Sequence, residues 1–289
     1  MTARTGSPGK AAMPTADFTQ PAGEPALASP DSISWRVFKN PVALYIGGTA
    51  AVLLELAEPR VRSGVWDHTT FRTDPLARMQ RTGLAAMVTV YGARSVAEKM
   101  IAGVTRMHGK VKGVTPDGRK YTALEPELMD WVQVTASFGF VQAYHHFVAP
   151  LSAEERDRFY AEAQVSAQLY GAPGAPANES QQQSLFEAML PQLEASDIVF
   201  EFLDIMRRTG GLPLLIRPLQ PLFLRAAVSI LPAPVRKRLQ LDRNYQLANW
   251  QRALVCKGGA LSDRIVLRSA PPAQACRRLG LPADYLYKK

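Results

Sequence analysis

The stretch that decides the fold runs from residue 74 to residue 111 and reads DPLARMQRTGLAAMVTVYGARSVAEKMIAGVTRMHGKV. Asp74 followed by Pro75 is an N-cap residue with proline at the first helical position, which marks the start of a helix. Apolar residues then recur at helical spacing as far as Val90, and Tyr91-Gly92 interrupts the pattern. A second series follows at the same spacing: Val96, Met100, Val104, Met107 and Val111. The stretch therefore predicts two consecutive amphipathic helices.

Polar side chains lie beside both apolar faces. Arg78 and Thr82, four residues apart, border the stripe of the first helix. His108 falls within the apolar sector of the second helix, so we expect its imidazole to point inward. A lone histidine in such a position is usually a core residue bonded to a backbone carbonyl. The functional alternative is a non-covalent haem pocket, with a neutral imidazole as ligand and Arg78 and Arg81 as cations for the propionates. The spacing alone favours the structural interpretation over the haem pocket.

The segments on either side of this stretch are also patterned. Residues 42–56 form an apolar run around Gly47-Gly48, where the missing side chains would let another helix or a flat ligand approach the backbone. Residues 61–73 are expected to be a short connector rich in aromatic and polar groups, His68 among them. Downstream, Pro116-Asp117-Gly118 predicts a tight turn that closes a small hairpin.

The remainder of the chain also predicts helices. Residues 125–147 are apolar nearly all round, which is typical of a buried helix. A capping box at Ser152 opens an amphipathic helix, and further helices are expected at 180–193, at 197–208 and around Tyr245, before a weakly patterned tail. Sustained strand alternation is not convincing anywhere. We therefore predict an all-α fold, mainly α in content.

The domain organisation follows from composition. Residues 1–30 are rich in Pro, Ala, Gly, Ser and Thr, so we predict a disordered leader followed by a single helical domain over 31–289. The two most apolar later runs fail as membrane spans, because 42–57 is short and contains Glu55, and 212–231 contains two arginines and three prolines. The second run could still lie on a membrane surface.

Charge and cysteine content restrict the function classes. The 34 Lys and Arg outnumber the 25 Asp and Glu, and the net charge of +9 favours anionic partners such as nucleic acid, acidic lipid or a cofactor with carboxylates. Cys256 and Cys276 form no C-x-x-C pair, which argues against a zinc knuckle and a covalent c-type haem site. With no secretory signal recognised, the two cysteines are interpreted as reduced thiols of a cytoplasmic protein.

Several common catalytic motifs are absent from the sequence. It contains no Gly-rich phosphate loop, no H-E-x-x-H and no G-x-S-x-G, and none of the four histidines has a glutamate three residues before it. Hydrolytic, nucleotide-driven and di-iron chemistry are therefore unsupported.

An ordered series of motifs resembles a known family. It comprises Asp67-His68-Thr69-Thr70-Phe71, Asp74-Pro75-Leu76-Ala77-Arg78-Met79-Gln80-Arg81-Thr82, Tyr91-Gly92, Arg106-Met107-His108-Gly109-Lys110-Val111-Lys112-Gly113, Pro116-Asp117-Gly118-Arg119-Lys120-Tyr121 and Phe159-Tyr160-Ala161-Glu162. Taken together over residues 46–231, these motifs resemble the MpaB-type oxygenases and latex clearing proteins, the rubber oxygenases. The resemblance implies a globin-like helical core with a haem b pocket between helices, and cleavage of isoprenoid carbon–carbon double bonds with dioxygen.

The resemblance also implies roles for individual residues. His108 takes the place of the proximal iron ligand, and Arg78 and Thr82 match an arginine and a threonine of the distal helix. Arg81 stands where latex clearing proteins have a lysine that can cap the iron, and a guanidinium, which stays protonated, is a poor iron ligand. The glutamate that serves as a base in some rubber oxygenases has no secure counterpart, although Arg62 and Asp67 lie in that region.

The sequence thus predicts a haem b-dependent oxygenase that acts with dioxygen on an apolar or isoprenoid-like small molecule. His108 is the expected metal ligand, and Arg78, Thr82 and Arg81 are the expected cofactor-binding and catalytic residues. Nucleic acid is not an expected partner. A peripheral membrane contact is expected at most, through a basic face that includes residues 236–238. Two alternatives stay open: a non-catalytic haem carrier or sensor, and a haem-free helical scaffold that binds membranes or acidic partners.

Overall fold

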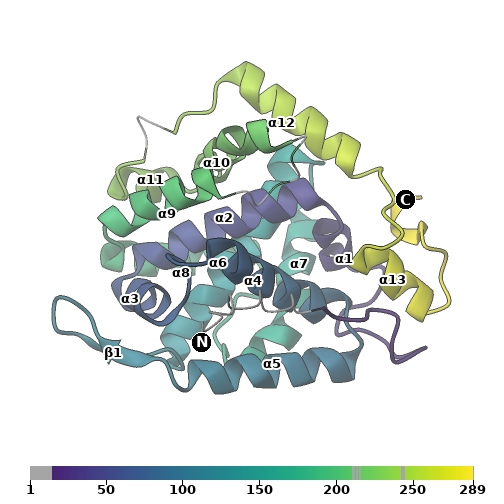
Figure 1. The fold of residues 1–289 in the computed structure, drawn as a ribbon, viewed down its shortest axis with the longest axis horizontal. Coiled ribbons are helices and arrows are strands. Elements are labelled where there is room, and N and C mark those ends of the chain that lie inside the picture. The colour runs from purple at the N-terminus through teal and green to yellow at the C-terminus, as the bar shows by residue number, and fades with distance from the viewer. Residues whose placement is uncertain (1–14, 210–211, 213, 215, 242–244, 289) are drawn as a thin grey trace, which may run out of the picture.

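The computed structural model describes residues 15–209, 212, 214, 216–241 and 245–288. Within these residues the chain forms thirteen α-helices, three short 3-10 turns and one two-stranded hairpin (Figure 1). The predicted all-α fold class is therefore confirmed.

The helices are α1 (Ile33–Phe38), α2 (Pro41–Ala57), α3 (Pro59–His68), α4 (Pro75–Tyr91), α5 (Arg94–His108), α6 (Pro126–Phe147), α7 (Ala153–Tyr170), α8 (Glu179–Met189), α9 (Asp197–Arg208), α10 (Gln220–Ser229), α11 (Ala233–Arg238), α12 (Asn249–Ser262) and α13 (Pro271–Arg278). Strands β1 (Lys112–Val114) and β2 (Lys120–Thr122) pair antiparallel, with Gly113 opposite Tyr121.

Helices α2 and α6 form the centre of the fold, with the other helices packed around them (Figure 1). Their backbones meet at two glycines, because a Cβ added to Gly47 would lie 2.7 Å from the carbonyl oxygen of Gly139. The indole Nε1 of Trp131 on α6 donates a hydrogen bond of 3.2 Å to the carbonyl of Leu54 on α2. The close approach predicted for Gly47-Gly48 is thus a helix-to-helix contact at Gly47.

Helices α4 and α5 correspond to the stretch that was expected to organise the fold. The Asp74 carboxylate accepts a hydrogen bond from the Ala77 N–H at 3.2 Å, so the predicted N-cap is confirmed. Gly92 ends α4 as expected. Both helices are thinly packed: α4 buries only its last turn, around Val88 to Tyr91, and α5 buries only Ala97 and Ile101. This pair lies side by side and leaves much of its surface accessible.

The structure corrects the predicted inward stripe of α5 and the predicted connector. The Met107 side chain is 68% exposed, and Val111 lies beyond the helix end at His108. Residues 59–68 of the expected connector form helix α3, because Glu58 is its N-cap and Pro59 its first residue. The hairpin turn is confirmed, with Gly118 at a φ of +88°.

Residues 15–30 correct the prediction of a disordered leader, of which residues 1–14 lie outside the described residues. Phe18 and Ala26 are buried in the main hydrophobic core. The buried Arg278 guanidinium donates to the carbonyl oxygens of Phe18 and Glu24 at 2.9 and 2.8 Å, and it also bonds Tyr91. Since a buried cation needs such partners, this segment is a packed part of the fold.

The C-terminal helices also differ from expectation. The helix expected around Tyr245 begins at Asn249, and α13 lies in the tail that seemed weakly patterned. Arg238 donates to the Leu193 and Pro191 carbonyls and Arg236 to the Ser229 and Leu231 carbonyls, so these two arginines of the predicted basic face also link α11 to neighbouring segments.

No single described helix is long and apolar enough to cross a membrane. Helices α2 and α3 pass such a test of length and composition only when taken together, and they bend by 110° where they join.

Candidate functional site

His108 ends α5, and its side chain is partly buried. Its Nδ1 atom is buried and has no hydrogen-bond partner, so the carbonyl contact expected of a core histidine is missing at this nitrogen. Burial lowers the pKa of His108, and the positive charge of Arg78 lowers it further. The imidazole is therefore neutral near pH 7, which is the form that binds a metal.

Arg78 lies between two other ionisable groups. Its charge acts on His108 of α5 and on Glu55 of α2, so Arg78 lies near both of these side chains. Burial raises the pKa of Glu55 to about 7, against the opposing effect of Arg78. Burial also lowers the pKa of Arg78, although a guanidinium stays protonated in any accessible pH range. This cluster of Glu55, Arg78 and His108 is called the triad below.

Thr82 and Arg81 occupy the exposed side of α4. The Thr82 hydroxyl donates a hydrogen bond of 3.1 Å to the carbonyl of Arg78, so it can offer only lone pairs to another group in this rotamer. The Arg81 guanidinium donates to the Thr70 hydroxyl at 2.8 Å, and its charge contributes to the lowered pKa of Arg78. The structure therefore places Arg78 and His108 together, with Thr82 and Arg81 on the margin.

Apolar side chains of four helices are packed against the core while keeping accessible surface. They include Leu44 and Val52 on α2, Met79 and Met87 on α4, Val96 and Met100 on α5, and Val132 and Phe140 on α6. Two hydroxyls on these helices, Tyr45 Oη and Thr105 Oγ1, are buried without a hydrogen-bond partner. Gly83 on α4 is exposed, and a Cβ at that position would meet no atom within 4 Å.

Comparison with known proteins identifies the family at this point. The family described as ER-bound oxygenase mpaB/B'/rubber oxygenase, catalytic domain, matches residues 35–257. The chain belongs to this oxygenase family. No curated protein and no solved structure matches the chain. The match confirms the resemblance on which the sequence analysis relied, and it supports an enzyme of the oxygenase class.

Within this oxygenase-family domain, the other histidines lie elsewhere. His68 is exposed and meets the Tyr121 ring edge-on at 6.4 Å between ring centres. His145 accepts a hydrogen bond from the Leu151 N–H at 3.0 Å, and His146 has a pKa lowered to about 4, mainly by burial. No group of three or more histidine, cysteine or acidic side chains suited to a metal ion occurs among the described residues.

The family motif at residues 159–162 has a structural role in this oxygenase-family domain. Tyr160 is fully buried on α7, and the Glu162 carboxylate accepts the N–H groups of Ile33 and Ser34 at the start of α1, at 3.1 and 2.9 Å. The two cysteines are free, Cys276 being buried and Cys256 donating to the carbonyl of His146.

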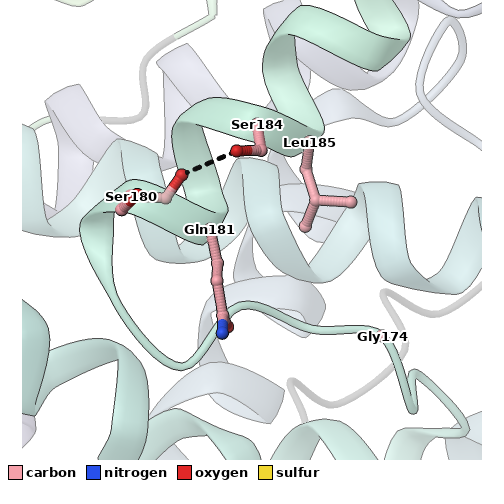
Figure 2. Close-up of a pocket in the computed structure, with 5 residues that line it drawn as sticks. All are labelled: Gly174, Ser180, Gln181, Ser184 and Leu185. Atoms are coloured by element: carbon pink, nitrogen blue, oxygen red, sulfur yellow. Dashed lines mark hydrogen bonds between the residues drawn. The ribbon is translucent and has the colours of Figure 1, made fainter.

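A surface pocket of about 350 Å³ lies apart from the triad. Figure 2 shows its lining from α8 and the preceding loop: Gly174, Ser180, Gln181, Ser184 and Leu185. The Ser184 hydroxyl donates to the carbonyl of Ser180 at 3.1 Å, so it is already occupied within the helix. The pocket lining contains no ionisable side chain, and none of the predicted site residues belongs to it.

Glu55 is the member of the triad that sequence reasoning missed. It was noticed only as a reason why residues 42–57 cannot span a membrane. A single carboxylate inside an otherwise apolar helix was nevertheless a usable signal, because such a group is seldom even partly buried without a function or a partner. Arg62 and Asp67, the two residues of the region considered beside the missing glutamate, lie on α3, where Arg62 donates to the Leu56 carbonyl.

Proposed function

We propose that the chain is a haem b-dependent oxygenase that acts with dioxygen on an apolar, isoprenoid-like substrate, and that His108 is its iron ligand. The observation that carries this proposal is the buried Nδ1 of His108, which has no hydrogen-bond partner and belongs to a ring kept neutral by burial and by Arg78. A buried polar atom without a partner is costly, and the cost is understandable where a bound group completes the site.

The residue types on the helices that carry the triad are compatible with a haem. Partly accessible apolar side chains on α2, α4 and α5, and on the neighbouring α6, would provide apolar walls for a porphyrin, and Arg78 would provide a cation for a propionate. When bound, haem supplies the activation of dioxygen that an oxygenase needs. Arg81, held by the Thr70 hydroxyl, is assigned the weaker role of adding positive charge from the exposed side of α4.

Glu55 supplies proton chemistry in this proposal. With a pKa of about 7, its carboxyl group is protonated in part of the population at neutral pH and ionised in the rest. A group whose pKa lies near the working pH is suited to take up and release a proton, and Arg78 favours its ionised form. Thr82 would accept a hydrogen bond in the site, because its own proton is donated to Arg78.

Haem content tests the proposal directly. The protein, expressed with ample haem supply, is expected to be reddish with a Soret band. His108→Ala is expected to lose most of the bound haem while its helical circular dichroism stays the same, because the ligand is lost but the core is not. His68→Ala, at an exposed histidine, is the matched control and should keep its haem.

Two outcomes would contradict the proposal. A colourless wild-type protein, or full haem content in His108→Ala with an unchanged Soret band, would remove the assigned ligand. Stable haem without oxygen consumption in the presence of unsaturated isoprenoid lipids would indicate a carrier or sensor, and it would remove the oxygenase assignment for this chain.

A further inference from the structure

Helix α12 carries large apolar side chains on its outer face. Trp250, Leu254 and Leu261 are 68%, 42% and 64% exposed. Their spacing of four and seven residues places them on one side of the helix. Val255 and Gly259, on the opposite side, are buried against the core. Figure 1 shows α12 along the outer edge of the molecule, in agreement with the exposure of these three side chains.

Two further large apolar residues are exposed just beyond the end of the helix. Ile265 and Leu267 are 50% and 56% exposed in the segment that leads to α13. Single exposed apolar residues need no explanation, but five large ones within one short segment of chain mark an interaction surface. The name outer face is used below for these five residues together with the cations beside them.

The charges beside this surface are mostly positive. Lys257, Arg264 and Arg268 are exposed in the same segment. Asp263 is the one acidic residue between positions 249 and 270, and it is turned inward, with its carboxylate 3.1 Å from Lys39 Nζ. The guanidinium of Arg252 lies over the Phe147 ring at 5.3 Å, so it belongs to the contact between α12 and α6.

We propose that the outer face binds the surface of an anionic lipid bilayer. Tryptophan and leucine suit the boundary between headgroups and acyl chains, while lysine and arginine beside them attract acidic lipids. A protein partner would favour a different composition, because the centre of a protein interface is depleted of charged residues, and Lys257 lies on the same side of α12 as Trp250 and Leu254.

This proposal is independent of the haem assignment, since it concerns a different face and its test needs no activity. It concerns a different surface from the basic face expected at residues 236–238, where Arg236 and Arg238 make hydrogen bonds to backbone carbonyls. It would also place the domain beside the phase in which an apolar substrate dissolves.

The natural tryptophans provide a direct readout. Trp35, Trp66 and Trp131 are buried, with at most 9% of their surface exposed, whereas Trp250 is 68% exposed. The full-length protein is mixed with phosphatidylcholine vesicles that contain phosphatidylglycerol, and with vesicles of phosphatidylcholine alone. The protein is expected to co-sediment with the anionic vesicles, with a blue shift of its tryptophan emission, and to be released as salt concentration rises.

Matched variants locate the contact. Trp250→Glu is expected to weaken partitioning about tenfold or more, since a large apolar side chain no longer enters the bilayer. Lys257→Gln is expected to weaken it about fivefold, the effect of one cation near an acidic surface. Leu169→Glu, at an apolar residue on α7 that is 41% exposed, and Lys99→Gln, at an exposed lysine on α5, are the controls and should bind as the wild type does.

The contrary outcomes are equally clear. Absence of binding to anionic vesicles would overturn the proposal, and so would equal binding by Trp250→Glu with an unchanged circular dichroism spectrum. Sedimentation of the protein without vesicles tests the alternative partner, a second copy of the chain. If the wild type self-associates and Trp250→Glu does not, the outer face is a contact between two copies of the chain, and the lipid assignment is wrong.

Discussion

The pKa of Glu55 leads to a prediction about stability and pH. The carboxyl has an ordinary pKa of 4.5, which burial raises to about 7 in the folded chain. The folded state therefore holds this proton more tightly than the unfolded state does. The stability associated with the protonated carboxyl is fully present below pH 4.5 and is lost as the pH rises through 7. Over that whole range the loss is about 3 kcal/mol.

Glu55→Gln removes this titration and keeps the shape of the side chain. The difference in free energy of unfolding between variant and wild type is expected to move in favour of the variant by about 2 kcal/mol between pH 5.5 and pH 8.5. For a protein of this size, that corresponds to a relative gain of about 4–8 °C in the melting temperature. Comparing the two proteins at each pH cancels the titration of all other groups.

Thermal unfolding followed by circular dichroism at the two pH values measures this effect. Glu98→Gln is the matched control, because Glu98 is an exposed carboxylate on α5 beside Arg94. If the melting temperatures of wild type and Glu55→Gln differ by the same amount at pH 5.5 and pH 8.5, the pKa of this carboxyl is not raised in the folded protein, and its assigned role in proton chemistry fails.

Two further substitutions test the packing. Gly139→Ala should lower stability by about 3 kcal/mol or more, because the added methyl collides with the backbone of Gly47, whereas Gly83→Ala should raise it by roughly 0.5–1 kcal/mol in open space. Phe18→Ala should lower the free energy of unfolding, measured by heat or urea, by about 3 kcal/mol, whereas Thr15→Ala, at an exposed site, should change it very little. Equal effects of the two substitutions would support the original prediction that this segment is disordered.

Features with local causes were predictable from the sequence. The start of α4 depends on Asp74 and Pro75, the capping box of α7 on Ser152 and Glu155, and the hairpin on the turn at Gly118. Each is decided within a few residues by hydrogen bonds to the nearest backbone groups, so the pattern of the chain contains the necessary information.

Features with distant causes were not predictable in this way. The segment around Phe18 looked disordered because its partner, Arg278, is about 260 positions away. In the sequence, Glu55 only interrupts an apolar run, because the nearness of Arg78 depends on how α4 packs against α2. Arg78 and His108 were placed correctly on their helices by spacing, but their mutual influence depends on how α4 and α5 pack together, which spacing along the chain does not give.

The glycine contact between α2 and α6 has a consequence for how the chain folds. All-helical proteins generally fold fast because most of their contacts are local. Here the closest backbone approach joins Gly47 to Gly139, about 90 positions apart, so three helices and the hairpin must be held in a closed loop before it can form. Because closing that loop costs entropy before the contact can form, we expect this protein to fold more slowly than its helix content alone would indicate.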